Sequence, residues 1–281
     1  MKKILLITVL SLLAFSWTIA QSASDIAVPL SDPAKRGKLK VHINYGSVTV
    51  KGSPRKDVLV KYSEDDGEDD SDRDDDRHGD REDKDHKKNK DGLKRIGGGS
   101  LDLEVTEDGN EVKVQSGSWT KKINLNIEVP SGFDLNVSTY NDGDVKITNI
   151  QGAIEISDFN GSITAENISG SVLATSYNGE IKVTFDKITD GTPMSFTTFN
   201  GDIDLTFPPT LKATLKMKTE QGEVLSSFDM NVVKSGPVQK KEAKGGVYKV
   251  VIDEWVKGEV NGGGPEFTMK NYNGDIIIRK K

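Results

Sequence analysis

The sequence predicts an all-β protein, a single-chain β-solenoid in which short strands stack along one axis. Glycine recurs every nine residues, at Gly143, Gly152, Gly161, Gly170 and Gly179. A fixed period with one glycine per unit indicates that the same short piece of backbone is laid down repeatedly. Beyond residue 20 no segment has a convincing amphipathic helix pattern, so we expect strands throughout.

Each nine-residue unit has the pattern of one strand and one turn. The third and fifth positions are apolar, as in Ile154 and Ile156, and mostly polar residues alternate with them. This alternation is typical of a strand with one buried face. The turn positions contain Asn, Asp and Ser, which tolerate turn conformations. We therefore expect equivalent strands about 4.8 Å apart along the axis of the solenoid.

The eighth position of the unit alternates between aliphatic and aromatic side chains: Ile150, Phe159, Ile168 and Tyr177. The structural repeat is therefore 18 residues, two units per coil, with Phe159 stacked over Tyr177 and Ile150 over Ile168. We expect all four side chains to point into the interior at the corners. An antiparallel meander is the alternative, because turn signals every 8–12 residues or so are also typical of sandwiches and barrels.

The repeat continues beyond this block. Residues 199–203 and 272–276 copy an aromatic-Asn-Gly-Asp-Ile motif. A longer duplication relates the segments that follow Pro130 and Pro208, and we expect each proline to open a matching strand.

Residues 1–20 have the composition of a signal peptide. Lys2 and Lys3 precede the apolar stretch 4–19. Small residues stand before Gln21, the expected first residue after cleavage, with Ala23 as a second candidate. An uncleaved anchor helix is the alternative, although about 16 apolar residues are fewer than the ~20 that span a bilayer.

The chain has no cysteine. This excludes disulfides, thiolate metal sites, cysteine nucleophiles and the lipid-bearing cysteine of a lipoprotein. No later segment has the pattern of a transmembrane helix. We expect an exported protein that is periplasmic, associated with the outer membrane or extracellular.

The expected organisation is a signal peptide at 1–20, a linker at 21–37 and one strand-repeat domain at 38–281. A charged loop at 64–92 interrupts the domain, because this segment has no apolar residue and cannot bury enough surface to fold. Within the loop, Asp70, Asp72 and Asp74 have the spacing of an EF-hand. Asp75 stands where that motif needs glycine and Arg81 where it needs glutamate, so we expect only weak cation attraction.

Candidates for catalysis are few. His42 alternates with apolar residues on an expected strand and should face solvent, while His78 and His86 lie in the charged loop. The nearest pair of carboxylates is Asp202 and Asp204, on alternate positions of one strand. The repeat also lacks the ligand positions of calcium-binding β-rolls. We expect no catalytic, cofactor-binding or metal-binding residues, and no cofactor.

The motifs at 129–135 (VPSGFDL), 141–145 (NDGDV) and 272–278 (YNGDIII) together resemble the bacterial "putative adhesin" family of β-strand repeats, a domain of unknown function. The resemblance covers residues 38–62 and 97–281. It implies a β-solenoid fold and gives no catalytic residues to carry over. The charged loop departs from the usual pattern of that family.

These observations predict a non-enzymatic, exported cell-envelope protein, an adhesin or a structural binding solenoid. Its expected partner is an envelope or surface component, either glycan or protein. Nucleic acid is excluded as a partner because the net charge is −6 and no basic stripe exists. The alternatives are a glycan-active enzyme that uses an open solenoid face and a periplasmic envelope-sensing module. A carboxylate-lined groove would favour the enzyme.

Export gives the first testable prediction. Amino-terminal sequencing of the protein from envelope fractions should begin at Gln21 or within a few residues of it, because the leader ends in small residues. Recovery of the intact chain from the cytoplasm, starting at Met1, would contradict the prediction.

Overall fold

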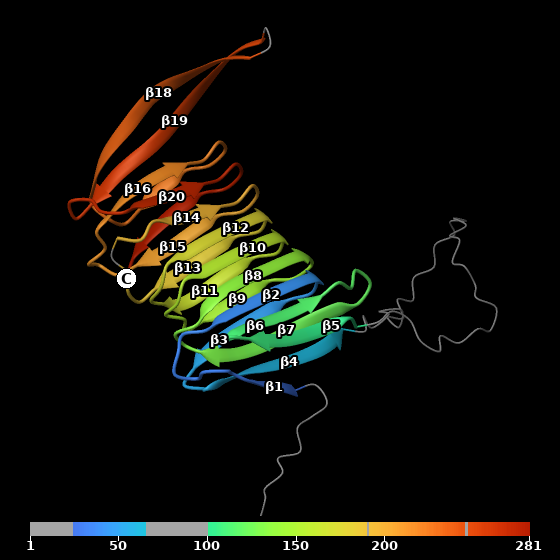
Figure 1. The fold of residues 1–281 in the computed structure, drawn as a ribbon. Helices are drawn as coiled ribbons and strands as arrows, with labels where there is room; N and C mark the ends of the chain where they lie inside the picture. The colour runs from blue at the N-terminus through green and yellow to red at the C-terminus, as the bar shows by residue number, and fades with distance from the viewer. Residues whose placement is uncertain (1–24, 66–100, 190, 245–246) are drawn as a thin grey trace, which may run out of the picture.

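The computed structural model describes residues 25–65, 101–189, 191–244 and 247–281. These residues form strands and turns without any helix, so the all-β prediction is confirmed, and none of them belongs to a helix that could cross a membrane. Two large sheets face each other (Figure 1), and from β6 to β18 the chain alternates between them from strand to strand. The predicted signal peptide lies outside the described residues.

Sheet A contains ten strands. In spatial order they are β1 (Asp25–Pro29), β4 (Asp57–Asp65), β7 (Lys122–Pro130), β3 (Val48–Ser53), β9 (Val145–Thr148), β11 (Ile163–Ile168), β13 (Ile181–Phe185), β15 (Ile203–Phe207), β21 (Ile276–Lys280) and β17 (Val224–Ser226).

Sheet B contains eleven strands. In spatial order they are β18 (Met230–Lys244), β19 (Val247–Val260), β16 (Ala213–Lys218), β20 (Glu266–Lys270), β14 (Met194–Thr197), β12 (Val172–Asn178), β10 (Ile154–Asn160), β8 (Asp134–Asn141), β2 (Lys38–Tyr45), β6 (Glu111–Ser116) and β5 (Leu103–Asp108).

The strands of the repeat pair in parallel, one coil above the next. Ile154 of β10 pairs with Val172 of β12, and Ile163 of β11 pairs with Ile181 of β13. Both partners are 18 residues apart, so the predicted two-unit coil is confirmed and the antiparallel meander is wrong. Antiparallel pairs occur at the two ends, where β1 and β4 extend sheet A, β5 extends sheet B, and the hairpin β18–β19 joins β16.

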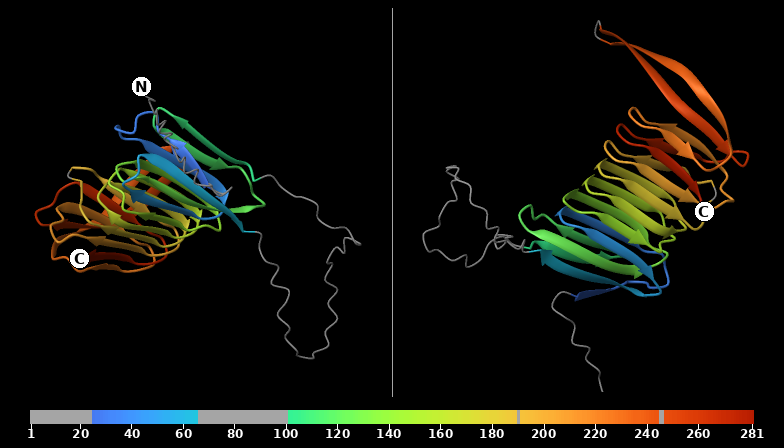
Figure 2. Two further views of the ribbon diagram at one scale, coloured as in Figure 1. Left: turned by 90° about the horizontal axis from the view of Figure 1, so that it is seen from below. Right: turned by 180° about the vertical axis from the view of Figure 1, so that it is seen from behind.

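The first and last coils in sequence order each lie one coil in from an end of the solenoid. The coil β2–β3 lies between β6–β7 and β8–β9, and the coil β20–β21 lies between β14–β15 and β16–β17. The hairpin β18–β19 projects past the last coil (Figures 1 and 2), since only residues 256–260 of β19 pair with β16.

The glycine period has a steric cause. Gly143, Gly161 and Gly179 form a row at one corner, and Gly152 and Gly170 form a row at the opposite corner. A Cβ atom on Gly143 would lie 1.7 Å from the carbonyl oxygen of Gly46, and one on Gly170 would lie 1.8 Å from that of Gly152. None of these five glycines has a positive φ. Close approach of adjacent coils therefore requires glycine at these positions, rather than an unusual backbone angle.

The eighth position of the unit behaves differently at the two corners. Ile150 and Ile168 are fully buried as predicted, but Phe159 and Tyr177 are 36% and 43% exposed, so the prediction that they point inward is wrong. The residue before each isoleucine, Asn149 or Asn167, has a φ near +60° and turns the chain inward. Strands β10 and β12 instead stay extended through this position, so their alternation places the ring outside.

Three smaller expectations need correction. Residues 21–37 contain strand β1, which pairs with β4 and buries Val28, so this part is not a linker. Pro130 is the last residue of β7 and Pro208 follows β15, so the prolines end strands, and both accept a hydrogen bond in matching turns.

Strand β4 extends to Asp65, within the segment predicted as the charged loop. Residues 66–92 of that loop lie outside the described residues.

The steric role of the corner glycines can be tested with one methyl group. Gly170→Ala should lower the free energy of unfolding by about 3 kcal/mol, because the methyl would overlap backbone that cannot move aside. Gly132→Ala is the matched control. A Cβ there meets nothing within 4 Å, so the change should stay within about 0.5 kcal/mol. Urea denaturation of both variants measures the difference, and equal stabilities would contradict the model of glycine packing.

Candidate binding surface

Five exposed aromatic side chains form a continuous stack along one corner of the solenoid, where strands of sheet B end. We call this the aromatic ridge. Neighbouring ring centroids are 4.7–5.0 Å apart and the ring planes differ by no more than 5°. The stacking of Phe159 over Tyr177 predicted by the repeat is thereby confirmed. The exposed fractions lie between 36% and 45%. In spatial order the ridge consists of Tyr140, Phe159, Tyr177, Phe199 and Tyr272.

Stacking determines which part of each ring a partner can reach. The internal rings have both faces covered by their neighbours, so their edges and hydroxyl groups face solvent. With roughly 200 Å² of surface per aromatic side chain, the ridge exposes about 400 Å² of contiguous apolar surface. Patches of this size on soluble proteins often mark interaction sites.

A row of asparagine amides runs beside the ridge. Asn273 Nδ2 donates to Asn200 Oδ1, Asn200 Nδ2 donates to Asn178 Oδ1, and Asn178 Nδ2 donates to Asn160 Oδ1, at 2.7, 2.7 and 2.8 Å. All three hydrogen bonds point the same way, so each polarises the next. Among the described residues, Asn160 Nδ2 has no acceptor. The amide row therefore ends in a polarised donor at Asn160.

Buried polar side chains lie beneath the ridge, one per coil. They precede the ring residues in sequence and point inward. Ser176, Thr198 and Asn271 donate to the carbonyl oxygens of corner glycines one coil away, at 2.8–3.3 Å. These bonds satisfy carbonyl groups that the close approach of the coils removes from water. These polar residues stand at the seventh position of the unit. The sequence pattern did not predict their burial, because the expected alternation of buried and exposed residues ends at the sixth position.

One member of this buried row is a carboxylic acid. Burial, with a smaller contribution from the charge of Asp144, raises the pKa of Asp158 to about 6, and polar groups of Thr139, Phe159 and Asn160 offset only part of this rise. Neither carboxylate oxygen makes a hydrogen bond of ordinary geometry. By position Asp158 matches Ser176, which donates to Gly161, so it can donate to the equivalent carbonyl of Gly143 only when protonated.

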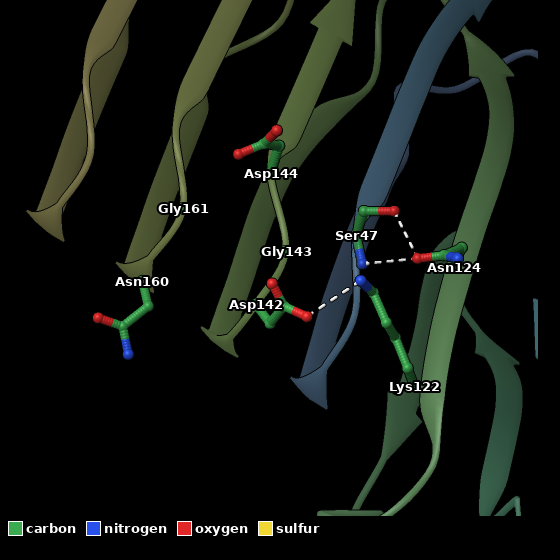
Figure 3. Close-up of a pocket in the computed structure, with 8 residues that line it drawn as sticks. All are labelled: Ser47, Lys122, Asn124, Asp142, Gly143, Asp144, Asn160 and Gly161. Atoms are coloured by element: carbon green, nitrogen blue, oxygen red, sulfur yellow. Dashed lines mark hydrogen bonds and ion pairs between the residues drawn. The ribbon is translucent and has the colours of Figure 1, made fainter. Parts of the chain in front are cut away.

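A polar cavity opens at the end of the ridge, beside Tyr140. We call this cavity the notch (Figure 3). Its volume is about 310 Å³. The motif here is Tyr-Asn-Asp-Gly, one residue longer than the aromatic-Asn-Gly of the other coils, and the extra residue Asp142 has a φ of +49°. This insertion interrupts the amide row and opens the cavity. The lining consists of Ser47, Lys122, Asn124, Asp142, Gly143, Asp144, Asn160 and Gly161.

Most polar groups of the notch are held in place. Lys122 Nζ lies 3.0 Å from Asp142 Oδ2. Asn124 Oδ1 accepts hydrogen bonds from Ser47 N and Ser47 Oγ, at 3.2 and 2.7 Å, which directs the Asn124 amide nitrogen away from Ser47 (Figure 3). Asp144 Oδ1 accepts from Ser162 N at 2.9 Å. The notch thus presents ammonium and amide donors next to two carboxylates.

Asp202 and Asp204, the nearest candidates for paired acids, each have a structural partner. Asp204 is 7% exposed and binds Arg279 Nε through both oxygens, at 2.8 and 3.1 Å. This carboxylate raises the pKa of the Arg279 guanidinium above its usual value. Asp202 Oδ1 accepts a hydrogen bond from Asp275 N at 2.8 Å. The two acids therefore hold adjacent coils together.

The remaining candidates from the sequence do not form a site. His42 lies on the outer face of β2 and is exposed, as predicted. Asp70, Asp72, Asp74, Asp75 and Arg81 of the weak EF-hand match, together with His78 and His86, lie outside the described residues. The ranges that the structure does describe contain no group of three or more acidic or histidine side chains placed to hold a metal ion.

Protonation of Asp158 gives a prediction about stability. Its pKa is about 6 in the folded protein and about 3.9 in an unfolded chain, so the folded state binds more protons between these values. The contribution of Asp158 to the free energy of unfolding is therefore highest below pH 4 and falls as the pH rises to 6. Asp158→Asn should raise the melting temperature at pH 7 and change it little at pH 4.

Glu155→Gln is the control for this prediction, because it removes the same charge from the solvent face of the same strand. It should have no comparable effect at either pH. Thermal denaturation followed by circular dichroism measures both variants. A melting temperature of Asp158→Asn that exceeds that of the wild type equally at pH 4 and pH 7 would contradict the assignment.

Comparisons with known proteins gave one structural neighbour and one family match. The chain is similar in structure to a "putative cell adhesion protein" from Clostridium sporogenes, with 12% sequence identity, a TM-score of 0.42, and coverage of 92% of this chain and 99% of that one. No curated protein matches the chain in sequence. Residues 93–254 match the family model described as Toastrack DUF4097. This match spans more than half of the chain, and the protein belongs to the Toastrack DUF4097 family.

Proposed function

We propose that this protein is an exported, non-enzymatic binding protein of the bacterial cell envelope that holds a protein partner on its aromatic ridge. The observation that carries the proposal is the ridge itself. Five aromatic rings are kept at the surface in one unbroken stack, although burial of the same side chains would have contributed to stability.

The geometry of the ridge favours a protein over a glycan as the partner. A sugar ring stacks on the face of an aromatic ring, and the internal faces of the ridge are covered. Ring edges and phenolic hydroxyl groups suit the mixed apolar and polar contacts of protein interfaces, in which tyrosine is enriched. Tyr140, Tyr177 and Tyr272 alternate with phenylalanines, so their hydroxyl groups recur every second coil, about 10 Å apart.

Features outside the ridge also support the proposed binding role. The leader supports export, and the family is built on repeated strands. The candidate acids Asp202 and Asp204 have structural partners. The alternative function, a glycan-active enzyme, therefore no longer has these two residues as candidate catalytic acids. A binding surface that repeats along one axis can combine several weak contacts into a stable one.

Binding to envelope fractions tests the proposal. The exported protein should bind fractions from the organism that makes it, and protease treatment of the fractions should abolish binding, because the partner is a protein. The double variant Phe159→Ala/Tyr177→Ala should bind at least about tenfold more weakly, since it removes the centre of the ridge. Leu173→Ala is the control, because Leu173 is 47% exposed on the same strand but outside the ridge.

Circular dichroism establishes that both variants are folded before binding is compared. Binding that survives protease treatment and still depends on Phe159 and Tyr177, or a double variant that binds as tightly as Leu173→Ala, would contradict the proposal.

A further inference from the structure

Trp119 stands apart from the other rings of this corner. Its ring centroid lies 5.2 Å from that of Tyr140, and the two planes meet at 77°. It is 58% exposed, the highest fraction among the six rings, and it alone has no parallel neighbour. A ring oriented in this way can offer its face to a ligand. That face carries the negative part of the ring quadrupole and attracts the partly positive C–H bonds of an apolar surface.

Trp119 and its neighbour Tyr140 belong to two chain segments that also line the notch. Trp119 lies three residues before Lys122, and Tyr140 lies two residues before Asp142. Because the Trp119 ring lies against Tyr140, and the segments of Tyr140 and Lys122 both reach the notch, the ring and the Lys122–Asp142 ion pair lie at the same end of the ridge.

The polar groups of the notch select the class of ligand. Asn160 Nδ2 is the donor end of the polarised amide row, and Lys122 is a second donor. Asp142 and Asp144 are acceptors. A ligand that both donates and accepts at several neighbouring positions matches this mixture. Inorganic anions are disfavoured by the two carboxylates, and divalent cations are disfavoured by the ammonium group of Lys122, which lies 3.0 Å from Asp142.

We propose that the notch and Trp119 form a binding site for a neutral saccharide, with a pyranose ring stacked on Trp119 and hydroxyl groups bound by Asn160, Lys122, Asp142 and Asp144. A volume of about 310 Å³ is at the lower end for ligand pockets and suits one or two sugar rings. The site uses neither the faces nor the edges of the ridge from Phe159 onward. The inference therefore stands independently of the protein partner proposed for the ridge.

Titration of the exported protein with three neutral trisaccharides tests the site: triacetylchitotriose, cellotriose and maltotriose. A Trp255→Phe background leaves Trp119 as the only tryptophan after residue 20, so its fluorescence reports directly on the notch. At least one trisaccharide should bind with a Kd below about 1 mM, since two rings can contact protein. The substitution Trp119→Ala should weaken trisaccharide binding at least tenfold, as measured by calorimetry because this variant lacks the fluorescent ring.

Asn160→Asp is the sharper variant. The new carboxylate still accepts the hydrogen bond from Asn178 but removes the free donor, so saccharide binding should weaken about fivefold while the fold is kept. Asn149→Asp is its matched control, because Asn149 Oδ1 likewise accepts a hydrogen bond from the neighbouring asparagine, Asn167 Nδ2, at the opposite corner. Tyr272→Ala controls for loss of a ring at the far end of the ridge. Both controls should bind within twofold of the wild type.

Three outcomes would overturn the inference. The first is that no trisaccharide binds below about 1 mM. The second is that Trp119→Ala and Asn160→Asp bind as tightly as their controls. The third is that calcium chloride or inorganic phosphate, each tested alone, changes Trp119 fluorescence while the trisaccharides do not. Loss of envelope binding by the ridge variant Phe159→Ala/Tyr177→Ala, with trisaccharide binding intact, would separate the two sites.

Discussion

The contact between a corner glycine and the carbonyl oxygen of the coil beside it sets the geometry of the whole protein. A side chain at Gly143 or Gly170 would overlap that oxygen, so the coils can approach to strand spacing only where glycine stands. The approach removes carbonyl groups from water, and the buried hydroxyl and amide groups of Ser176, Thr198 and Asn271 compensate for this loss. Packing and polar satisfaction are thus solved together at the corner beneath the ridge.

Once the coils are fixed at this spacing, equal positions in successive coils must form rows. Aromatic side chains become the ridge, asparagines become the polarised amide row, and valines and isoleucines become the core. A row gains from its neighbours only if every coil carries the same chemistry, because ring stacking and amide polarisation both act between adjacent members. The repeated motif is therefore explained by pairwise stabilisation along the axis, and its exposure to solvent makes it available to a partner.

The sequence was sufficient for the fold class, the 18-residue coil and the buried third and fifth positions, because all of these follow from period and alternation. It was insufficient for the direction of Phe159 and Tyr177. That direction depends on whether the preceding residue turns the chain, as Asn149 does with its positive φ, or leaves it extended, as Asp158 does. The intercalation of the first and last coils was also missed, since strand order depends on contacts that no local pattern records.

The notch shows how a repeat acquires a specific site. Regular coils present equivalent side chains at every step, so a ligand that contacts such a row meets the same groups at each coil. The one-residue insertion at Asp142 breaks the register at a single coil, which exposes the donor end of the amide row and places the Lys122–Asp142 ion pair in the same cavity. A departure from the repeat thus gathers ammonium, amide and carboxylate groups at one place. In a solenoid of this kind, the coil that breaks the pattern is the one where a small ligand can be distinguished from the rest of the surface.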